Sequence, residues 1–100
     1  MAELDKIVHE RARLLILTYL VGADKKEVSF NELKEELDFT PGNLSIQLKK
    51  LVGAKYIKMK KTFKDNKPHT TVSVTTNGAE ALSTYVAEME DIIRVLKSQP

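Results

Sequence analysis

Residues 40–51 read TPGNLSIQLKKL, and this stretch has the features of a complete amphipathic helix. Thr40 is a good N-cap, and Pro41 suits the first helical position because its missing N–H would have no partner there. Leu44, Leu48 and Leu51 recur at i, i+4 and i+7, which predicts one buried stripe. The opposite face would carry small, amide, hydroxyl and cationic groups and no carboxylate: Gly42, Asn43, Ser45, Ile46, Lys49 and Lys50.

A second short helix is predicted just before the first, at 30–37, preceded by a very short strand at Val28. Ser29 is its N-cap, and Glu32 completes a Ser-x-x-Glu capping box. Only three residues then separate the two helices, which is typical of a helix-turn-helix. Plain packing units share this arrangement, so the pair alone leaves both interpretations open.

The N-terminal segment is predicted to be a helix from Leu4 to Val21, ended by Gly22. From Leu14 onward it is apolar nearly all round, so it should be buried on more than one side. In a chain of 100 residues, the simplest source of the missing cover is a second copy of the protein.

Two alternating segments after the central helix, 56–63 and 69–75, predict a β-hairpin. The tip between them, KDNKP at 64–68, is turn-rich and cationic. The residues expected on the inner side are Ile57, Met59, Phe63, Val72 and Val74.

A last helix is predicted at 76–97, with Thr75 or Thr76 as its cap. Its apolar residues form one continuous stripe, and a helix of this length is about 30 Å long. We expect it to project and pair with a second copy, although folding back across its own domain is the alternative. The residues assigned to a homodimer interface on this helix and the first are Leu4, Ile7, Val8, Tyr85, Met89, Ile92, Ile93 and Leu96.

The whole chain of 1–100 is therefore expected to be a single α+β domain, mainly α. Its parts are an N-terminal helix at 1–22, a helix-turn-helix at 29–54, a hairpin at 56–75 and a C-terminal helix at 76–97. With no Cys, disulfides, thiolate metal sites and thiol catalysis are excluded. No run of eighteen apolar residues and no signal pattern is present, so we expect a soluble, cytoplasmic protein that does not enter a membrane.

The charge is concentrated in the middle of the chain. Residues 1–39 carry −3 and residues 70–100 carry −2, whereas residues 40–69 hold eight Lys and one acid, a net +7. A basic block between mildly acidic segments favours a polyanionic partner that meets one side of the molecule. A solvated lysine-rich surface is the plainer alternative.

Three segments together resemble the small winged-helix transcriptional regulators of the MarR and ArsR type, especially their short archaeal and bacterial members. They are FNELKEELDFTPGNLSIQLKKL at 30–51, YIKMKKTF at 56–63 and VSVTTNGAEAL at 72–82. In the last, Val74 to Gly78 is similar to the family's Leu-Thr-x-x-Gly junction between strand and helix. The family has Gly before the residue that starts the hairpin, where this chain has Lys55, so either Lys55 adopts φ > 0 or the helix ends early at Gly53.

The resemblance implies a sequence-specific regulator of transcription, a repressor, that binds a pseudo-palindromic operator in double-stranded DNA as a homodimer. Helix 41–52 would enter the major groove, and the wing at 56–75 would lie on the backbone or in the minor groove. The implied DNA-binding residues are Thr40, Asn43, Ser45, Ile46, Gln47, Lys49, Lys50, Lys60, Lys61, Lys64, Lys67 and His69.

The chemistry of the helix face fits this interpretation. Asn43 and Gln47 suit bidentate pairing with adenine, Lys49 suits guanine, and Ile46 suits a thymine methyl group. No Arg stands on this face, so we expect modest base discrimination and a large electrostatic share of the affinity.

Other classes fit less well. His9 and His69 lie in separate elements and cannot form a metal site together without Cys, and no nucleophile, phosphate loop or cofactor motif points to an enzyme. A small-molecule effector between the first and last helices is possible but unsupported. A winged-helix module that binds an acidic protein partner remains the alternative function.

Overall fold

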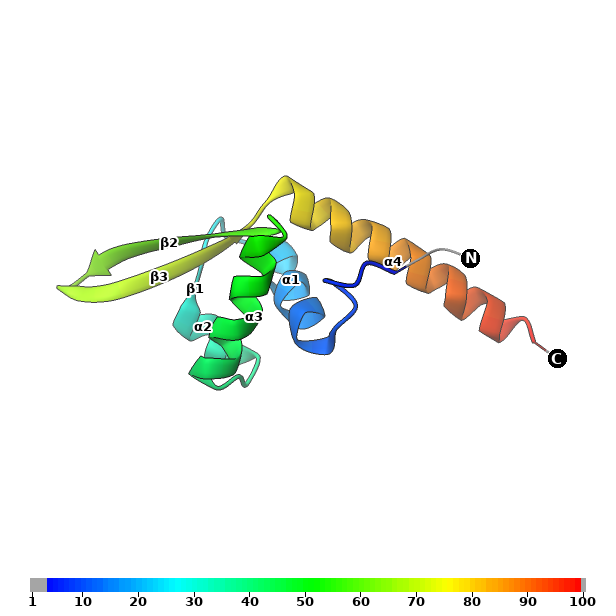
Figure 1. Ribbon diagram of the computed structural model, residues 1–100, viewed down its shortest axis with the longest axis horizontal. Coiled ribbons are helices and arrows are strands. Elements are labelled where there is room, and N and C mark those ends of the chain that lie inside the picture. The colour runs from blue at the N-terminus through cyan, green and yellow to red at the C-terminus, as the bar shows by residue number, and fades with distance from the viewer. Residues whose placement is uncertain (1–3, 100) are drawn as a thin grey trace.

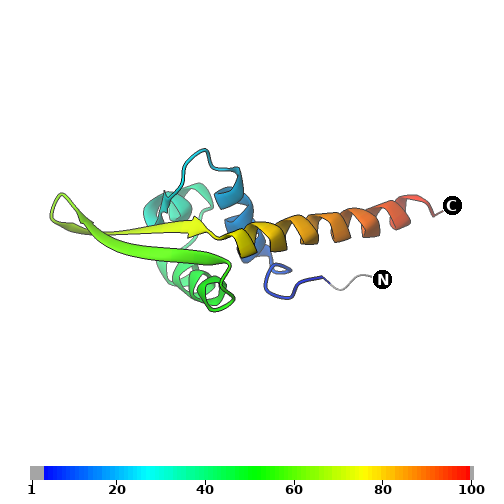
Figure 2. The ribbon, with the colours of Figure 1, turned by 90° about the horizontal axis from the view of Figure 1, so that it is seen from above.

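The computed structural model describes residues 4–99 and has the winged-helix architecture that the sequence predicts (Figure 1). The elements in order are α1 (Arg11–Gly22), β1 (Val28–Ser29), α2 (Phe30–Glu36), α3 (Pro41–Gly53), β2 (Ile57–Lys64), β3 (Lys67–Val74) and α4 (Thr76–Lys97). The molecule measures 61 × 25 × 24 Å, because the β2–β3 hairpin projects at one end and α4 at the other (Figures 1 and 2). The first three helices form the body between them.

The predicted leucine stripe of α3 forms the centre of the core. Leu44, Leu48 and Leu51 are each 0% exposed, and they pack with buried residues of α1 and α2 such as Leu17 and Leu33. Burying a leucine side chain is worth roughly 1.5–3 kcal/mol. This stripe therefore fixes the orientation of α3 and turns its other face outward.

The N-terminal helix is shorter than predicted. It begins at Arg11, because the Glu10 side chain caps it by accepting hydrogen bonds from the backbone N–H groups of Ala12 and Arg13. Before it, residues 4–10 form turns in which the Asp5 carboxylate accepts from the N–H groups of Ile7 and Val8. Acidic side chains that bond to nearby backbone compete with helix formation in this way. Residues 1–3 of the predicted helix lie outside the described residues.

Both helices of the helix-turn-helix end in the same motif. Asp38 follows α2 with φ 56°, and Lys55 follows α3 with φ 65°. The backbone N–H of Lys55 donates to the carbonyl of Val52, and that of Tyr56 donates to the carbonyl of Leu51. This pair of bonds defines a Schellman motif, in which glycine is the usual left-handed residue. The two possibilities that the sequence left open are therefore both realised, since the helix ends at Gly53 and Lys55 adopts φ > 0.

The wing belongs to a three-stranded antiparallel sheet in the order β1-β3-β2. The very short strand predicted at Val28 is confirmed, and Val28 pairs with Val72 of β3. The hairpin turn is tighter than predicted, because the strands extend to the pair Lys64 and Lys67. Asp65 and Asn66 form the two-residue loop with φ of 52° and 62°. Such turns need φ > 0 at both positions, which Asp and Asn tolerate better than most residues.

The junction between β3 and α4 explains the Val74 to Gly78 motif. Thr75 caps α4 by accepting from the N–H of Gly78, and its hydroxyl donates to the carbonyl of Lys55 at 2.7 Å. A Cβ atom at Gly78 would lie 2.1 Å from the carbonyl oxygen of Tyr56. Glycine is therefore required here by the close approach of two backbones.

Within residues 4–99, no helix is both long enough and apolar enough to cross a membrane.

Candidate nucleic-acid interface

The outward face of α3 is open to solvent as predicted. Ile46 on this face is 56% exposed. The other predicted helix-face residues that are exposed are Thr40, Asn43, Ser45, Lys49 and Lys50. The hydroxyl oxygen of Thr40 accepts a hydrogen bond from the N–H of Asn43 and so caps the helix.

Gln47 differs from its neighbours because it is half-buried and already bonded. Nη1 of Arg13, on α1, donates to Oε1 of Gln47 at 2.9 Å, and Nε2 of Gln47 donates to Oδ1 of Asn43 at 3.4 Å. Arg13 itself is only 8% exposed. Nothing in the sequence singled out Arg13, since a charged residue early in an apolar helix is usually solvated.

Arg13 is held from the other side by the N-terminal turns. Its Nε donates to the carbonyl of Ile7 at 2.6 Å, and its Nη2 donates to the carbonyl of Lys6 at 3.5 Å. The carboxylate of Glu10 lies 3.5 Å away. A buried guanidinium needs such partners, because an unpaired one would be strongly destabilising.

The register of the hairpin divides the wing into two faces. Cross-strand partners share a face, and successive residues alternate. One face carries the charge: Lys58, Lys60, Thr62 and Lys64 of β2 with Ser73, Thr71, His69 and Lys67 of β3. Four of the five predicted wing residues lie on this face, and Lys61 lies on the other. Lys58, which was not among the predicted residues, lies at the base of the charged face.

The second face of the wing is mostly apolar, apart from Lys61 and Thr70. Ile57 is buried at its base, whereas Met59 is 37% exposed and Phe63 is 79% exposed, opposite Pro68 on β3. The sequence placed Phe63 on the same side as Ile57, and the register agrees. The hairpin reaches beyond the body of the protein (Figure 1), however, and Phe63 near its tip is exposed.

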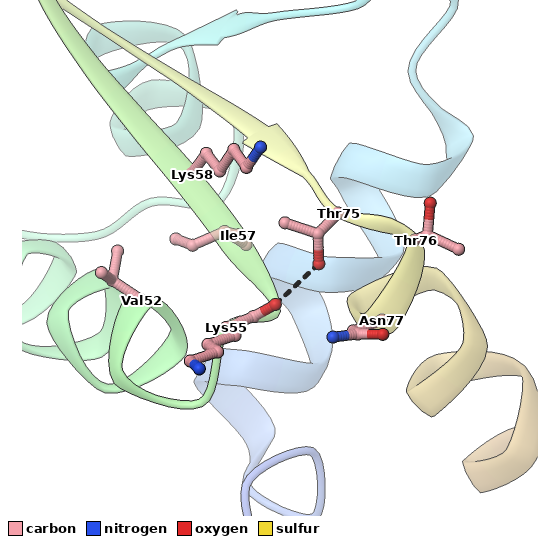
Figure 3. A pocket seen from close by; sticks show the side chains of 7 residues that line it. All are labelled: Val52, Lys55, Ile57, Lys58, Thr75, Thr76 and Asn77. Atoms are coloured by element: carbon pink, nitrogen blue, oxygen red, sulfur yellow. Dashed lines mark hydrogen bonds between the residues drawn. The ribbon is translucent and has the colours of Figure 1, made fainter.

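A pocket of about 440 Å³ lies where α3, the wing and α4 meet (Figure 3). Lys55 and Lys58 line it, together with Thr76 and Asn77 from the first turn of α4. The Thr75 hydroxyl joins α4 to the Lys55 carbonyl across this junction. Through these two lysines, the row of basic side chains continues from the end of α3 to the base of the wing.

The N-terminal turns are pinned to the start of the hairpin. The Tyr56 hydroxyl donates to the Asp5 carboxylate, and this bond, with burial and the charge of Asp5, raises the pKa of Tyr56 to about 12. Nδ1 of His9 lies 2.8 Å from the hydroxyl of Tyr85 on α4. His9 therefore joins the N-terminal segment to α4.

Within residues 4–99, no three His, Cys, Asp or Glu side chains gather in a metal-binding arrangement.

The residues predicted to form a dimer interface fall into two groups. Val8 (0% exposed) and Tyr85 (5%) are buried in the core of the chain itself, so they leave no surface for a second copy. The others keep some or most of their surface: Leu4, Ile7, Met89 and Ile92 are half-buried, and Ile93 (42%) and Leu96 (67%) are exposed. Leu82, Tyr85, Met89, Ile92 and Leu96 continue one stripe along α4, and its cover decreases toward the C-terminus.

Comparison with known proteins supports the same fold. Residues 12–93 match the family model of a winged helix DNA-binding domain. Uncharacterized protein MJ0432 of Methanocaldococcus jannaschii is 36% identical over 84 residues, which cover 84% of this chain and 89% of that protein.

Solved structures agree with this match. The transcriptional regulator homologue protein from Pyrococcus horikoshii OT3 superposes with a TM-score of 0.82 at 28% identity, covering 90% of this chain and 87% of that one. Staphylococcus aureus MepR in its DNA complex superposes with a TM-score of 0.74 at 17% identity, covering 94% and 75%. The expected resemblance to small winged-helix transcriptional regulators is confirmed, and with most of its length matched, the chain belongs to the family of winged helix DNA-binding domains.

Proposed function

We propose that the protein is a sequence-specific regulator that binds double-stranded DNA, with α3 in the major groove and the wing on the backbone or in the minor groove. The observation that carries this proposal is the position of the basic segment. Residues 40–69, with a net charge of +7, form the exposed face of α3 and much of the projecting hairpin. Lysines neutralise phosphates and release counterions, and the helix supplies polar groups for base edges.

We also propose that the protein binds DNA as a symmetric homodimer. The distal part of α4 projects from the body (Figure 2) and carries the exposed side chains of Ile93 and Leu96. Nothing within residues 4–99 covers them, and a two-fold axis through α4 would pair each copy with the other. Two copies of α3 related in this way would meet a pseudo-palindromic operator. We propose that the protein acts as a repressor when it occupies such a site.

The experiment is an electrophoretic mobility shift on duplex DNA with unlabelled competitor, repeated over a range of salt concentrations. If a dimer contacts about six to ten phosphates, the affinity should fall about 10³-fold or more between about 50 and 200 mM salt. A shift that competitor DNA of unrelated sequence removes fully would contradict sequence-specific binding. No shift at low salt would favour the alternative module, in which the basic face binds an acidic protein.

A further inference from the structure

The amide group of Gln47 is held in one orientation by a buried arginine. A guanidinium group donates hydrogen bonds and accepts none, so the Gln47 atom that lies 2.9 Å from Nη1 of Arg13 is its carbonyl oxygen. The amino group of Gln47 therefore faces the opposite way. The bonds from Arg13 to the carbonyls of Lys6 and Ile7 keep the guanidinium in place.

The orientation of the Gln47 amide also fixes that of the Asn43 amide. Because Nε2 of Gln47 faces Asn43, the Asn43 atom 3.4 Å away must be the acceptor, Oδ1. Asn43 is exposed, and its own amino group is left without a partner along this chain of bonds. The carbonyl oxygen of each amide thus faces a donor within the protein, and the groups left unbonded are one N–H of Gln47 and both N–H groups of Asn43.

The neighbouring polar groups on α3 also offer mainly hydrogen-bond donors. Lys49 and Lys50 are exposed, and an ammonium group only donates. The hydroxyl of Ser45 can act either way. Residues 41–53 contain no carboxylate, so no strong acceptor stands on this face.

We propose that Arg13 is a positioning residue for base specificity, and that it makes α3 a reader of guanine rather than adenine. This inference rests on the proposed DNA-binding function. Bidentate pairing with adenine needs one donor and one acceptor from the same amide, whereas guanine offers two acceptors, N7 and O6, in the major groove. Thymine offers one acceptor and a methyl group, and cytosine offers a donor that this face would reject.

The test is selection of preferred sites from randomised duplex DNA, followed by affinity measurements on single-base variants of the selected site. Asn43→Ala identifies the base that Asn43 contacts, as the position where discrimination disappears. At that position the wild-type protein should prefer guanine to adenine by roughly 2- to 12-fold, the worth of one hydrogen bond. Replacing that guanine by 7-deazaguanine, which lacks the N7 acceptor, should weaken binding by a similar factor.

Two variants test the role of the chain of hydrogen bonds from Arg13 through Gln47 to Asn43, called the relay below. Arg13→Met should free the Gln47 carbonyl, and Gln47→Met should free the Asn43 carbonyl, so both should shift the preference toward adenine. Gln47→Met is included because Arg13 also holds the N-terminal turns, and its loss could unfold the protein. Lys26→Met is the control, since it replaces an exposed lysine that lies outside α3 and the wing. It should leave both the affinity and the base preference nearly unchanged.

The outcomes separate the inference from the proposed function. A wild-type protein that binds no DNA selectively would overturn both. Selective binding with adenine preferred at the Asn43 position, or with no position lost in Asn43→Ala, would overturn the inference and leave the function standing. A preference for guanine that neither relay variant shifts would show that Arg13 does not set it.

Discussion

Lys55 occupies a backbone position that favours glycine. Its φ of 65° lies in the left-handed region, where a Cβ atom is strained. We expect Lys55→Gly to raise the free energy of unfolding by about 0.5–1 kcal/mol, measured by urea denaturation. Lys55→Ala removes the same charge but keeps the Cβ atom, so it should give no such gain. Equal stability of the two variants would rule out strain as the cause.

Gly78 is the opposite case, because space rather than φ requires it. A Cβ atom 2.1 Å from the Tyr56 carbonyl must displace either α4 or the start of the hairpin. We expect Gly78→Ala to lower the free energy of unfolding by about 1–3 kcal/mol or more. Gly42, on α3, has nothing within 4 Å of the same built atom, so Gly42→Ala should be neutral or stabilising by up to about 1 kcal/mol. A similar loss in both variants would contradict the steric explanation.

At the scale of elements, helix and wing should contribute to binding in different ways. Lys64 and Lys67 flank the hairpin turn and suit phosphate contacts. Changing both to Ala should weaken binding to all sequences alike and lower the slope of log affinity against log salt by roughly two per protomer at most. Lys26→Ala with Lys97→Ala, two exposed lysines outside both elements, should leave the slope nearly unchanged. A loss of sequence preference in the wing variant would instead make the wing a reader of bases.

The elements that could be predicted from the sequence are those specified by local patterns. The stripe of Leu44, Leu48 and Leu51 has helical spacing, the caps at Ser29 and Thr40 lie beside the N–H groups they accept from, and the hairpin alternates. Each signal lies within a few residues. Tertiary packing then has little to change.

The features that could not be predicted depend on distant contacts. The start of α1 is set by Glu10, whose carboxylate interrupts an apolar pattern that otherwise continues. The orientation of Gln47 depends on Arg13, 34 residues away. Val8 and Tyr85 have the same apolar character as Ile92, and only the extent of the chain's own core decides which of them is covered. Periodicity identifies an apolar face but not the surface that meets it.

At the scale of the whole molecule, the feature on which the proposed dimer depends is the partly covered apolar stripe on α4. Ile92 is half-buried and Leu96 is 67% exposed, on a helix that extends beyond the body. We expect Ile92→Asp to give monomers in light scattering at micromolar concentration, because a carboxylate would have to be buried in the dimer. Val95→Asp is the control, since Val95 is 60% exposed but lies off this stripe, and it should remain dimeric. A well-folded Ile92→Asp dimer would exclude α4 as the interface.

The tight contact between Gly78 and Tyr56 also limits how far α4 can tilt at its base, and so limits the geometry of the proposed dimer. α4 has 22 residues, so it acts as a lever about 33 Å long at about 1.5 Å per residue. A tilt of about 10° at its base would displace the far end by about 6 Å, which exceeds the spacing of about 3.4 Å between successive base pairs. In the proposed dimer, a side chain at position 78 would therefore shift the two reading helices by more than one base pair. The missing methyl group at Gly78 would then help to determine the spacing of the operator half-sites.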